Sequence, residues 1–120
     1  MRLGIALSGV GSNMLALAQA CRDGRIPADI RLVASDRSDA PGLARATELG
    51  LPTATIARLK DEPRDAHDAR LRAAFESSGV DCIALAGYMR ILSAHFVAAY
   101  AGRLLNIHPS LLPRHKGLHT

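Results

Sequence analysis

Aromatic side chains are scarce in this sequence of 120 residues. They make up 3% of it, and tryptophan is absent. Proteins that bind single-stranded nucleic acid stack bases on aromatic rings, so that class has little support. The net charge of +4 suits an anionic small molecule as well as nucleic acid. Because the fifteen basic residues are scattered without a run of like charge, we expect no nucleic-acid partner.

Cysteines and long apolar runs are also few. Cys21 and Cys82 are too far apart for a disulfide framework, and Cys82 lies in an apolar run typical of a small core residue. No Cys, His and carboxylate cluster has metal-ligand spacing, so we expect no metal. The apolar runs are shorter than a membrane span, and residues 1–7 are too few for a secretory signal. These absences predict a cytoplasmic protein without a membrane partner.

Short apolar runs alternate with helix-forming stretches along the chain. The expected strands are residues 3–7, 30–34, 52–56, 80–86 and 103–107, and the expected helices are residues 14–21, 41–49, 64–77 and 93–100. This alternation predicts an α/β fold with an open, mostly parallel, Rossmann-like sheet. Such a sheet binds ligands beyond the carboxyl ends of its strands. Two histidines, His67 and His95, are expected on the surfaces of their helices.

A glycine-containing loop, residues 9–13, follows the first expected strand and precedes a helix. Backbone N–H groups at such a junction favour an anion, and Ser12 and Asn13 can cap the helix or donate to a phosphate oxygen. A plain turn with Ser12 as the cap is one alternative. A dinucleotide fingerprint, with Asp36 binding a ribose, is another, but its third glycine would fall at Met14. A single phosphate therefore fits the loop better than a pyrophosphate.

An amide and an imidazole end the last expected strand. Asn106 and His108 are two residues apart, so their side chains share one face of an extended chain, and Pro109 favours that extended conformation at His108. The amide can donate to a developing oxyanion, and the imidazole can move a proton or carry positive charge. This pair suits acyl transfer, although a histidine before a proline can also be an ordinary loop residue. A Gly-x-Ser-x-Gly nucleophile motif does not occur in the sequence.

Three segments together resemble the phosphoribosylglycinamide formyltransferase family of purine synthesis. They are residues 8–13 (SGVGSN), 87–92 (GYMRIL) and 105–113 (LNIHPSLLP). The resemblance runs from the first strand to the last residue. The third segment alone is shared by other formyltransferases and by formyltetrahydrofolate hydrolases. The first segment is the one that points to the enzyme acting on glycinamide ribonucleotide.

The resemblance implies a formyltransferase fold and a reaction between two substrates. A formyl group passes from 10-formyltetrahydrofolate, the formyl-donor co-substrate, to the amine of glycinamide ribonucleotide. The residues implied to bind the ribonucleotide are Gly11, Ser12 and Asn13. Those implied to bind the folate are Arg64, Met89, Arg90, Ile91, Leu92 and Asn106. The implied catalytic residues are Asn106 and His108, which stabilise the tetrahedral oxyanion, with His108 as the proton donor.

The sequence departs from the family in two respects. Tyr88 stands where phenylalanine is common. Family members also continue past Thr120 to a loop whose aspartate pairs with the catalytic histidine, so residues 1–120 correspond to the N-terminal, substrate-binding part of the domain, with the C-terminal part absent. We therefore expect the chain alone to be inactive. The edge left by its last strand needs cover from a longer chain or from another chain, which makes a homodimer conceivable.

Two other functions remain open at this point. One is a different 10-formyltetrahydrofolate-dependent formyltransferase or hydrolase, which would not need the ribonucleotide. The other is a non-catalytic nucleotide-binding module that has kept the fold. Ribonucleotide binding at residues 11–13 distinguishes the first, and dependence of turnover on His108 distinguishes the second.

Overall fold

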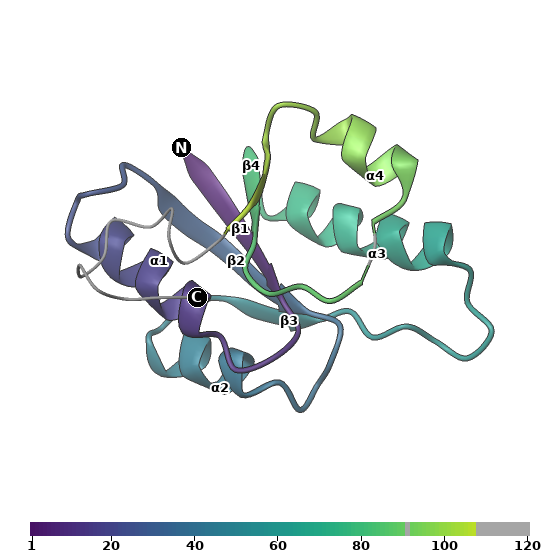
Figure 1. Ribbon diagram of the computed structural model, residues 1–120, viewed down its shortest axis with the longest axis horizontal. Helices are drawn as coiled ribbons and strands as arrows, with labels where there is room; N and C mark the ends of the chain where they lie inside the picture. Colours follow the sequence, from purple (N-terminus) through teal and green to yellow (C-terminus); the bar gives the residue numbers. More distant parts are fainter. Residues whose placement is uncertain (91, 108–120) are drawn as a thin grey trace.

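Strands and helices alternate along the chain in the computed structural model, which describes residues 1–90 and 92–107 (Figure 1). The strands are β1 (Arg2–Leu7), β2 (Asp29–Ser35), β3 (Thr53–Thr55), β4 (Cys82–Leu85) and β5 (Leu104–Asn106). The helices are α1 (Ser12–Arg22), α2 (Pro41–Glu48), α3 (Arg64–Ser77) and α4 (Ala94–Ala99). Every expected element is therefore present, and most bounds differ by one or two residues.

The five described strands form one sheet in the order β3-β2-β1-β4-β5, and every pairing is parallel. This confirms the predicted α/β fold. The chain builds outward from β1 in one direction through β2 and β3, and then in the other through β4 and β5. The sheet therefore has its topological switch point between β1 and β4, where ligands bind in open parallel sheets.

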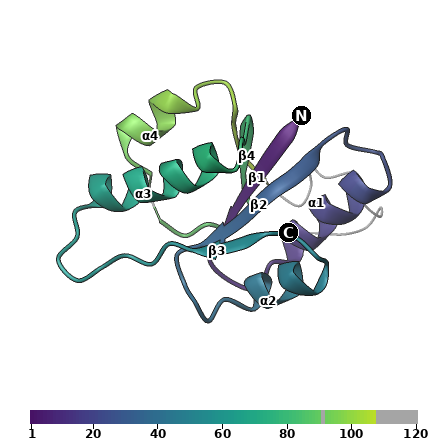
Figure 2. The same ribbon diagram turned by 180° about the vertical axis from the view of Figure 1, so that it is seen from behind.

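Two apolar layers cover the sheet. Figures 1 and 2 show α1 and α2 against one face and α3 and α4 against the other. Side chains of β1 alternate between them: Leu3, Ile5 and Leu7 join the buried cluster under α1 and α2, whereas Ala6 joins the cluster under α3 and α4. Because β1 is buried on both faces, its run of apolar residues is continuous rather than alternating with polar ones.

Helix starts follow from local sequence. Proline occupies the first position of α2 at Pro41 and the N-cap of α3 at Pro63, where its fixed φ suits the beginning of a helix. Ser93 caps α4 as predicted, because its side chain accepts a hydrogen bond from the Phe96 N–H. No helix among residues 1–90 and 92–107 is long and apolar enough to cross a membrane.

The amino ends of the adjacent strands β1 and β4 are joined by an exposed ion pair. Arg2, at the start of β1, donates from Nε and Nη2 to the Asp81 carboxylate at 3.1 and 2.9 Å. These hydrogen bonds hold the pKa of Asp81 down at about 2. The pair lies at the end of the sheet opposite to the carboxyl ends, which makes it a useful reference for substitutions at the functional end.

Candidate active site at the carboxyl ends of the strands

The loop after β1 turns into α1 through a left-handed glycine. Gly11 has φ +85° and is the N-cap of α1, so the helix begins at Ser12, two residues before the predicted start. Neither Ser12 nor another side chain in the described part of the chain caps this helix. The expectation that Ser12 caps this helix is therefore wrong. The first N–H groups of α1 therefore lack a side-chain acceptor, and together with the positive end of the helix dipole they can bind an anion.

Two glycines bring this loop against the start of α2. The Gly42 N–H donates to the Gly9 carbonyl at 3.0 Å. A Cβ added to Gly11 would lie 2.7 Å from the Gly42 Cα, which is closer than any real Cβ contact. Glycine is thus needed at position 11 both for its backbone conformation and for the space.

Ser8 joins the loop after β1 to the loop after β4. Its N–H donates to the Gly87 carbonyl at 3.2 Å, and its Oγ accepts from the Met89 N–H at 2.9 Å. The same hydroxyl donates to Asp36 Oδ1 at 2.7 Å. Three loops that follow the adjacent strands β2, β1 and β4 therefore meet at one buried hydroxyl.

Both carboxylate oxygens of Asp36 accept hydrogen bonds from these loops. Its Oδ1 accepts from Ser8 and its Oδ2 accepts from Arg90 Nε at 2.9 Å, while its side chain is only 6% exposed. A carboxylate that binds a ribose must present free oxygens to the ligand. The dinucleotide interpretation thus loses its ribose-binding acid, in addition to the missing third glycine.

A pocket of about 400 Å³ is lined by three of the residues that the family resemblance assigns to folate binding. Its described lining is Arg58, Arg64, His67, Asp68, Met89 and Arg90. Neither Arg58 nor Arg64 has an ion-pair partner among the described residues. Two unneutralised guanidinium groups in a hollow suit a ligand with carboxylates. Arg58 was not predicted, because nothing in its local sequence marks it.

His67 is buried, and the expectation that it lies on the helix surface is wrong. It is 1% exposed, and its Nε2 donates to the Ile56 carbonyl. The sequence carried a signal for this: His67, Leu71 and Phe75 follow one another at four-residue spacing and form the buried stripe of α3. His95, in contrast, is exposed on α4 as predicted.

Glu62 ties the segment before α3 to the helix. Its carboxylate accepts from Arg70 Nε at 2.8 Å and Nη2 at 2.7 Å, and from the Leu59 N–H at 2.9 Å. The Arg70 hydrogen bonds, followed by that of Leu59, lower the pKa of Glu62 from 4.5 to about 2. This pair holds the segment that carries Arg58 over the wall of the pocket.

We expect Glu62→Gln to lower the free energy of unfolding at pH 7. The difference from the parent chain should disappear in acid. The folded-state pKa lies below the unfolded one, so the stability contributed by Glu62 is present above pH 4.5 and is lost as the pH falls to about 2. Urea unfolding across this range measures it. Glu48→Gln, at an exposed glutamate without an ion pair among the described residues, is the control. A difference from the parent chain that stays constant with pH would contradict the prediction.

Tyr88 carries a buried hydroxyl with no hydrogen-bond partner within the described residues. Burial, followed by the nearby charges of Asp36 and Asp68, raises the pKa of Tyr88 well above its usual range. The phenol is therefore neutral and cannot serve as a base. Its ring packs with the apolar cluster under α3 and α4, a role that a phenylalanine fills without a hydroxyl.

Asn106 ends β5 beside the end of β4. It pairs in register with Leu85, and the next residue, Ile107, donates its N–H to the Leu85 carbonyl at 2.9 Å. Asn106 itself is exposed at this edge. Leu92 packs against the apolar cluster under α3 and α4. Two predicted site residues, Ile91 and His108, lie outside the described residues.

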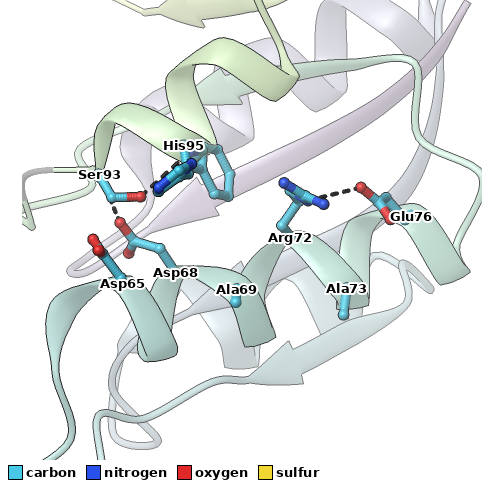
Figure 3. Close-up of a pocket in the computed structure, with 9 residues that line it drawn as sticks. Asp65, Asp68, Ala69, Arg72, Ala73, Glu76, Ser93 and His95 are labelled. Carbon is cyan, nitrogen blue, oxygen red and sulfur yellow. Dashed lines mark hydrogen bonds and ion pairs between the residues drawn. The ribbon is translucent and has the colours of Figure 1, made fainter.

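A second pocket, of about 300 Å³, lies between α3 and α4 (Figure 3). Some of its polar groups are hydrogen-bonded or ion-paired, whereas Asp68 Oδ1 accepts no hydrogen bond from the described residues. Arg72 pairs with Glu76 at 2.9 Å, and the buried Asp68 accepts from the Ser93 N–H through Oδ2. The hollow is lined by two helices and lies away from the glycine loop of β1, so we do not assign substrate binding to it. Within the part of the chain that the structure describes, no cluster of His, Cys, Asp and Glu could hold a metal ion.

Comparisons with known proteins agree with this arrangement. A model of the formyl transferase family matches residues 1–120. Phosphoribosylglycinamide formyltransferase of Escherichia coli (strain K12) is 46% identical over 120 residues, which are 100% of this chain and 57% of that protein. The crystal structure of glycinamide ribonucleotide transformylase 1 from Symbiobacterium toebii has a TM-score of 0.86 and 43% identity over 94% of this chain and 53% of that one. Phosphoribosylglycinamide formyltransferase from Brucella melitensis has a TM-score of 0.84 and 48% identity over 99% of this chain and 62% of that one.

The chain spans little more than half the length of these bacterial relatives. The matched span includes the three segments 8–13, 87–92 and 105–113 of the family resemblance. Since the family model covers every residue, the chain belongs to the formyl transferase family, and it is homologous over its whole length to phosphoribosylglycinamide formyltransferases.

Proposed function

We propose that this chain supplies the substrate-binding part of a phosphoribosylglycinamide formyltransferase. The enzyme would transfer a formyl group from 10-formyltetrahydrofolate to the amine of glycinamide ribonucleotide. The observation that carries the proposal is the junction at Ser8, where the glycine loop of β1 is hydrogen-bonded to the loop after β4. A reaction between two substrates requires their binding sites to lie side by side.

The glycine loop supports the phosphate end of the ribonucleotide. Gly11, Ser12 and Asn13 form the uncapped start of α1, where backbone N–H groups point outward and the helix dipole favours an anion. Ser12 is exposed and Asn13 is half-buried, so both side chains can reach a ligand. This combination suits one phosphate group on a small molecule.

The cationic pocket supports the folate. A 10-formyltetrahydrofolate molecule ends in a glutamate with two carboxylates, which can pair with Arg64 and Arg58, two arginines without an ion-pair partner among the described residues. The 89–92 segment, which by family resemblance binds the pterin through its backbone, begins at the same pocket with Met89 and Arg90. The donor would thus extend from the arginines toward the end of β4.

Asn106 and His108 would carry the chemistry beyond the carboxyl end of β5. The ribonucleotide amine attacks the formyl carbon and forms a tetrahedral intermediate, whose oxyanion the Asn106 amide and His108 stabilise. The bond between the formyl carbon and N10 of the folate then breaks. His108 donates a proton to the departing nitrogen, and the amine loses one, so the products are the formylated ribonucleotide and tetrahydrofolate.

A formyl-transfer assay with each substrate omitted in turn tests the proposal. Because the chain spans about half the length of its relatives, the assay compares the 120-residue chain with a polypeptide of the relatives' full length that carries these 120 residues. We expect turnover in the longer chain only when both substrates are present. Formate release without the ribonucleotide would indicate a hydrolase instead. Ribonucleotide binding with no turnover in the longer chain would favour a non-catalytic binding module.

A further inference from the structure

The Ser8 hydroxyl occupies a junction where its two hydrogen bonds have a fixed direction. A hydroxyl has one proton to donate, and it accepts with its lone pairs. Asp36 Oδ1 can only accept when ionised, so the Ser8 proton points to Asp36 at 2.7 Å. The lone pairs are thereby left toward the Met89 N–H at 2.9 Å. The direction of the Ser8 hydroxyl, and with it the position of the Met89 backbone, depends on the Asp36 carboxylate.

The second oxygen of the carboxylate acts on the next residue of the same loop. Arg90 Nε donates to Asp36 Oδ2 at 2.9 Å. The carboxylate is buried and the Arg90 side chain is 38% exposed, so this is a partly shielded, charge-assisted hydrogen bond. Asp36 thus holds two consecutive residues of the loop after β4. It acts on Met89 through Ser8, and it binds Arg90 directly.

We infer that Asp36 is a positioning residue for the folate donor. It acts through Ser8 and Arg90 and fixes the backbone of the loop after β4 in the conformation that binds the donor. The inference rests on the proposed function, in which the donor binds to that loop. The ribonucleotide loop depends less on Asp36, because Gly9 and Gly11 are held separately against α2.

Substitutions at Asp36 separate positioning from general stability. In a polypeptide of the relatives' full length, Asp36→Ala removes both hydrogen bonds, and we expect the Kd for 10-formyltetrahydrofolate to rise about tenfold. The Kd for glycinamide ribonucleotide should change by less than about threefold. Asp36→Asn keeps an acceptor for Ser8 and loses the charge that pairs with Arg90, so it should recover about half of the lost affinity on a logarithmic scale. Isothermal titration of each ligand measures these values.

A spectroscopic readout tests the geometry without any ligand. The Met89 N–H should exchange with solvent faster in Asp36→Ala and in Ser8→Ala than in the parent protein, as measured by NMR. The two substitutions share the Ser8–Asp36 hydrogen bond, so the double variant should weaken donor binding by less than the two single effects combined.

Asp81→Ala is the matched control. It removes an aspartate that pairs with an arginine across the adjacent strands β1 and β4, at the opposite end of the sheet. It should lower stability and leave both Kd values and the Met89 exchange rate unchanged. Asp36→Ala behaving in the same way would overturn the inference, as would equal weakening of both ligands.

The outcome also distinguishes this inference from the proposed function. A parent protein that does not bind 10-formyltetrahydrofolate would overturn both. A parent that binds it, with Asp36→Ala binding equally well, would overturn only the role of Asp36. Should Asp36→Ala fail to fold, Asp36→Asn and Ser8→Ala decide the question, because each keeps part of the junction. Unchanged donor affinity and unchanged Met89 exchange in both would refute the inference.

Discussion

Replacing His108 with alanine should lower kcat for formyl transfer by about 10²- to 10⁴-fold, the usual contribution of a positioned general acid. The assay uses a polypeptide of the relatives' full length that carries these 120 residues. The proposed role of His108 is to stabilise the oxyanion and to protonate the departing folate nitrogen. Both interactions act while the tetrahedral intermediate forms and breaks down. The KM values of the two substrates should therefore change little, because these interactions are stronger in the transition state than in the substrate complex.

His95→Ala is the control for this substitution. His95 is exposed on α4 and lines the pocket between α3 and α4, outside the three loops at the carboxyl ends of the strands. Its removal should leave kcat unchanged. Full turnover by His108→Ala would refute the proposed mechanism. A loss that appeared entirely in the KM for one substrate would instead make His108 a binding residue.

The fold was predictable because its signals are local. Each strand and helix is marked by its own apolar pattern, and several boundaries are marked by single residues such as Pro41, Pro63 and Ser93. In an alternating α/β chain these local signals also imply a parallel sheet. The carboxyl ends of its strands must then share one edge, so the location of the candidate site followed from the order of elements alone.

The hydrogen bonds that connect the loops of the site were not predictable from the same signals. Ser8 and Asp36 are 28 residues apart in the sequence, and Asp36 and Arg90 are 54 apart. Their contacts exist because β1 lies between β2 and β4, and the local patterns do not specify that order of strands. A solitary aspartate after a strand fits a ribose ligand or a structural anchor equally well until its neighbours are known.

Arg58 and His67 illustrate a different limit. The segment between β3 and α3 lacks periodicity, so its path over α3 depends on side-chain contacts such as the Glu62–Arg70 pair. That path brings Arg58 to the pocket and places the Ile56 carbonyl over His67. The burial of His67 could have been inferred from the stripe it shares with Leu71, but its hydrogen bond could not.

Replacing Gly11 with alanine should produce the largest effect of any single change in the loop after β1. The new side chain must adopt φ +85° and place its Cβ 2.7 Å from the Gly42 backbone. The left-handed conformation and the overlap each cost about 1 to 3 kcal/mol. We therefore expect the free energy of unfolding to fall by about 2 to 6 kcal/mol. A displacement of the loop by about 1 Å should weaken glycinamide ribonucleotide binding by about ten- to a hundredfold.

Gly24→Ala separates the cost of the left-handed conformation from the cost of the steric overlap in Gly11→Ala. Gly24 has φ +78°, close to that of Gly11, but an added Cβ would meet nothing within 4 Å. It should show the conformational cost alone and leave ribonucleotide binding intact. Urea unfolding and ligand titration on both variants measure this difference. The overlap displaces the loop after β1 and not the loop after β4. Gly11→Ala should therefore weaken binding of the ribonucleotide far more than binding of 10-formyltetrahydrofolate. Equal loss of both ligands would show that the glycine supports the whole fold and that the phosphate lies elsewhere.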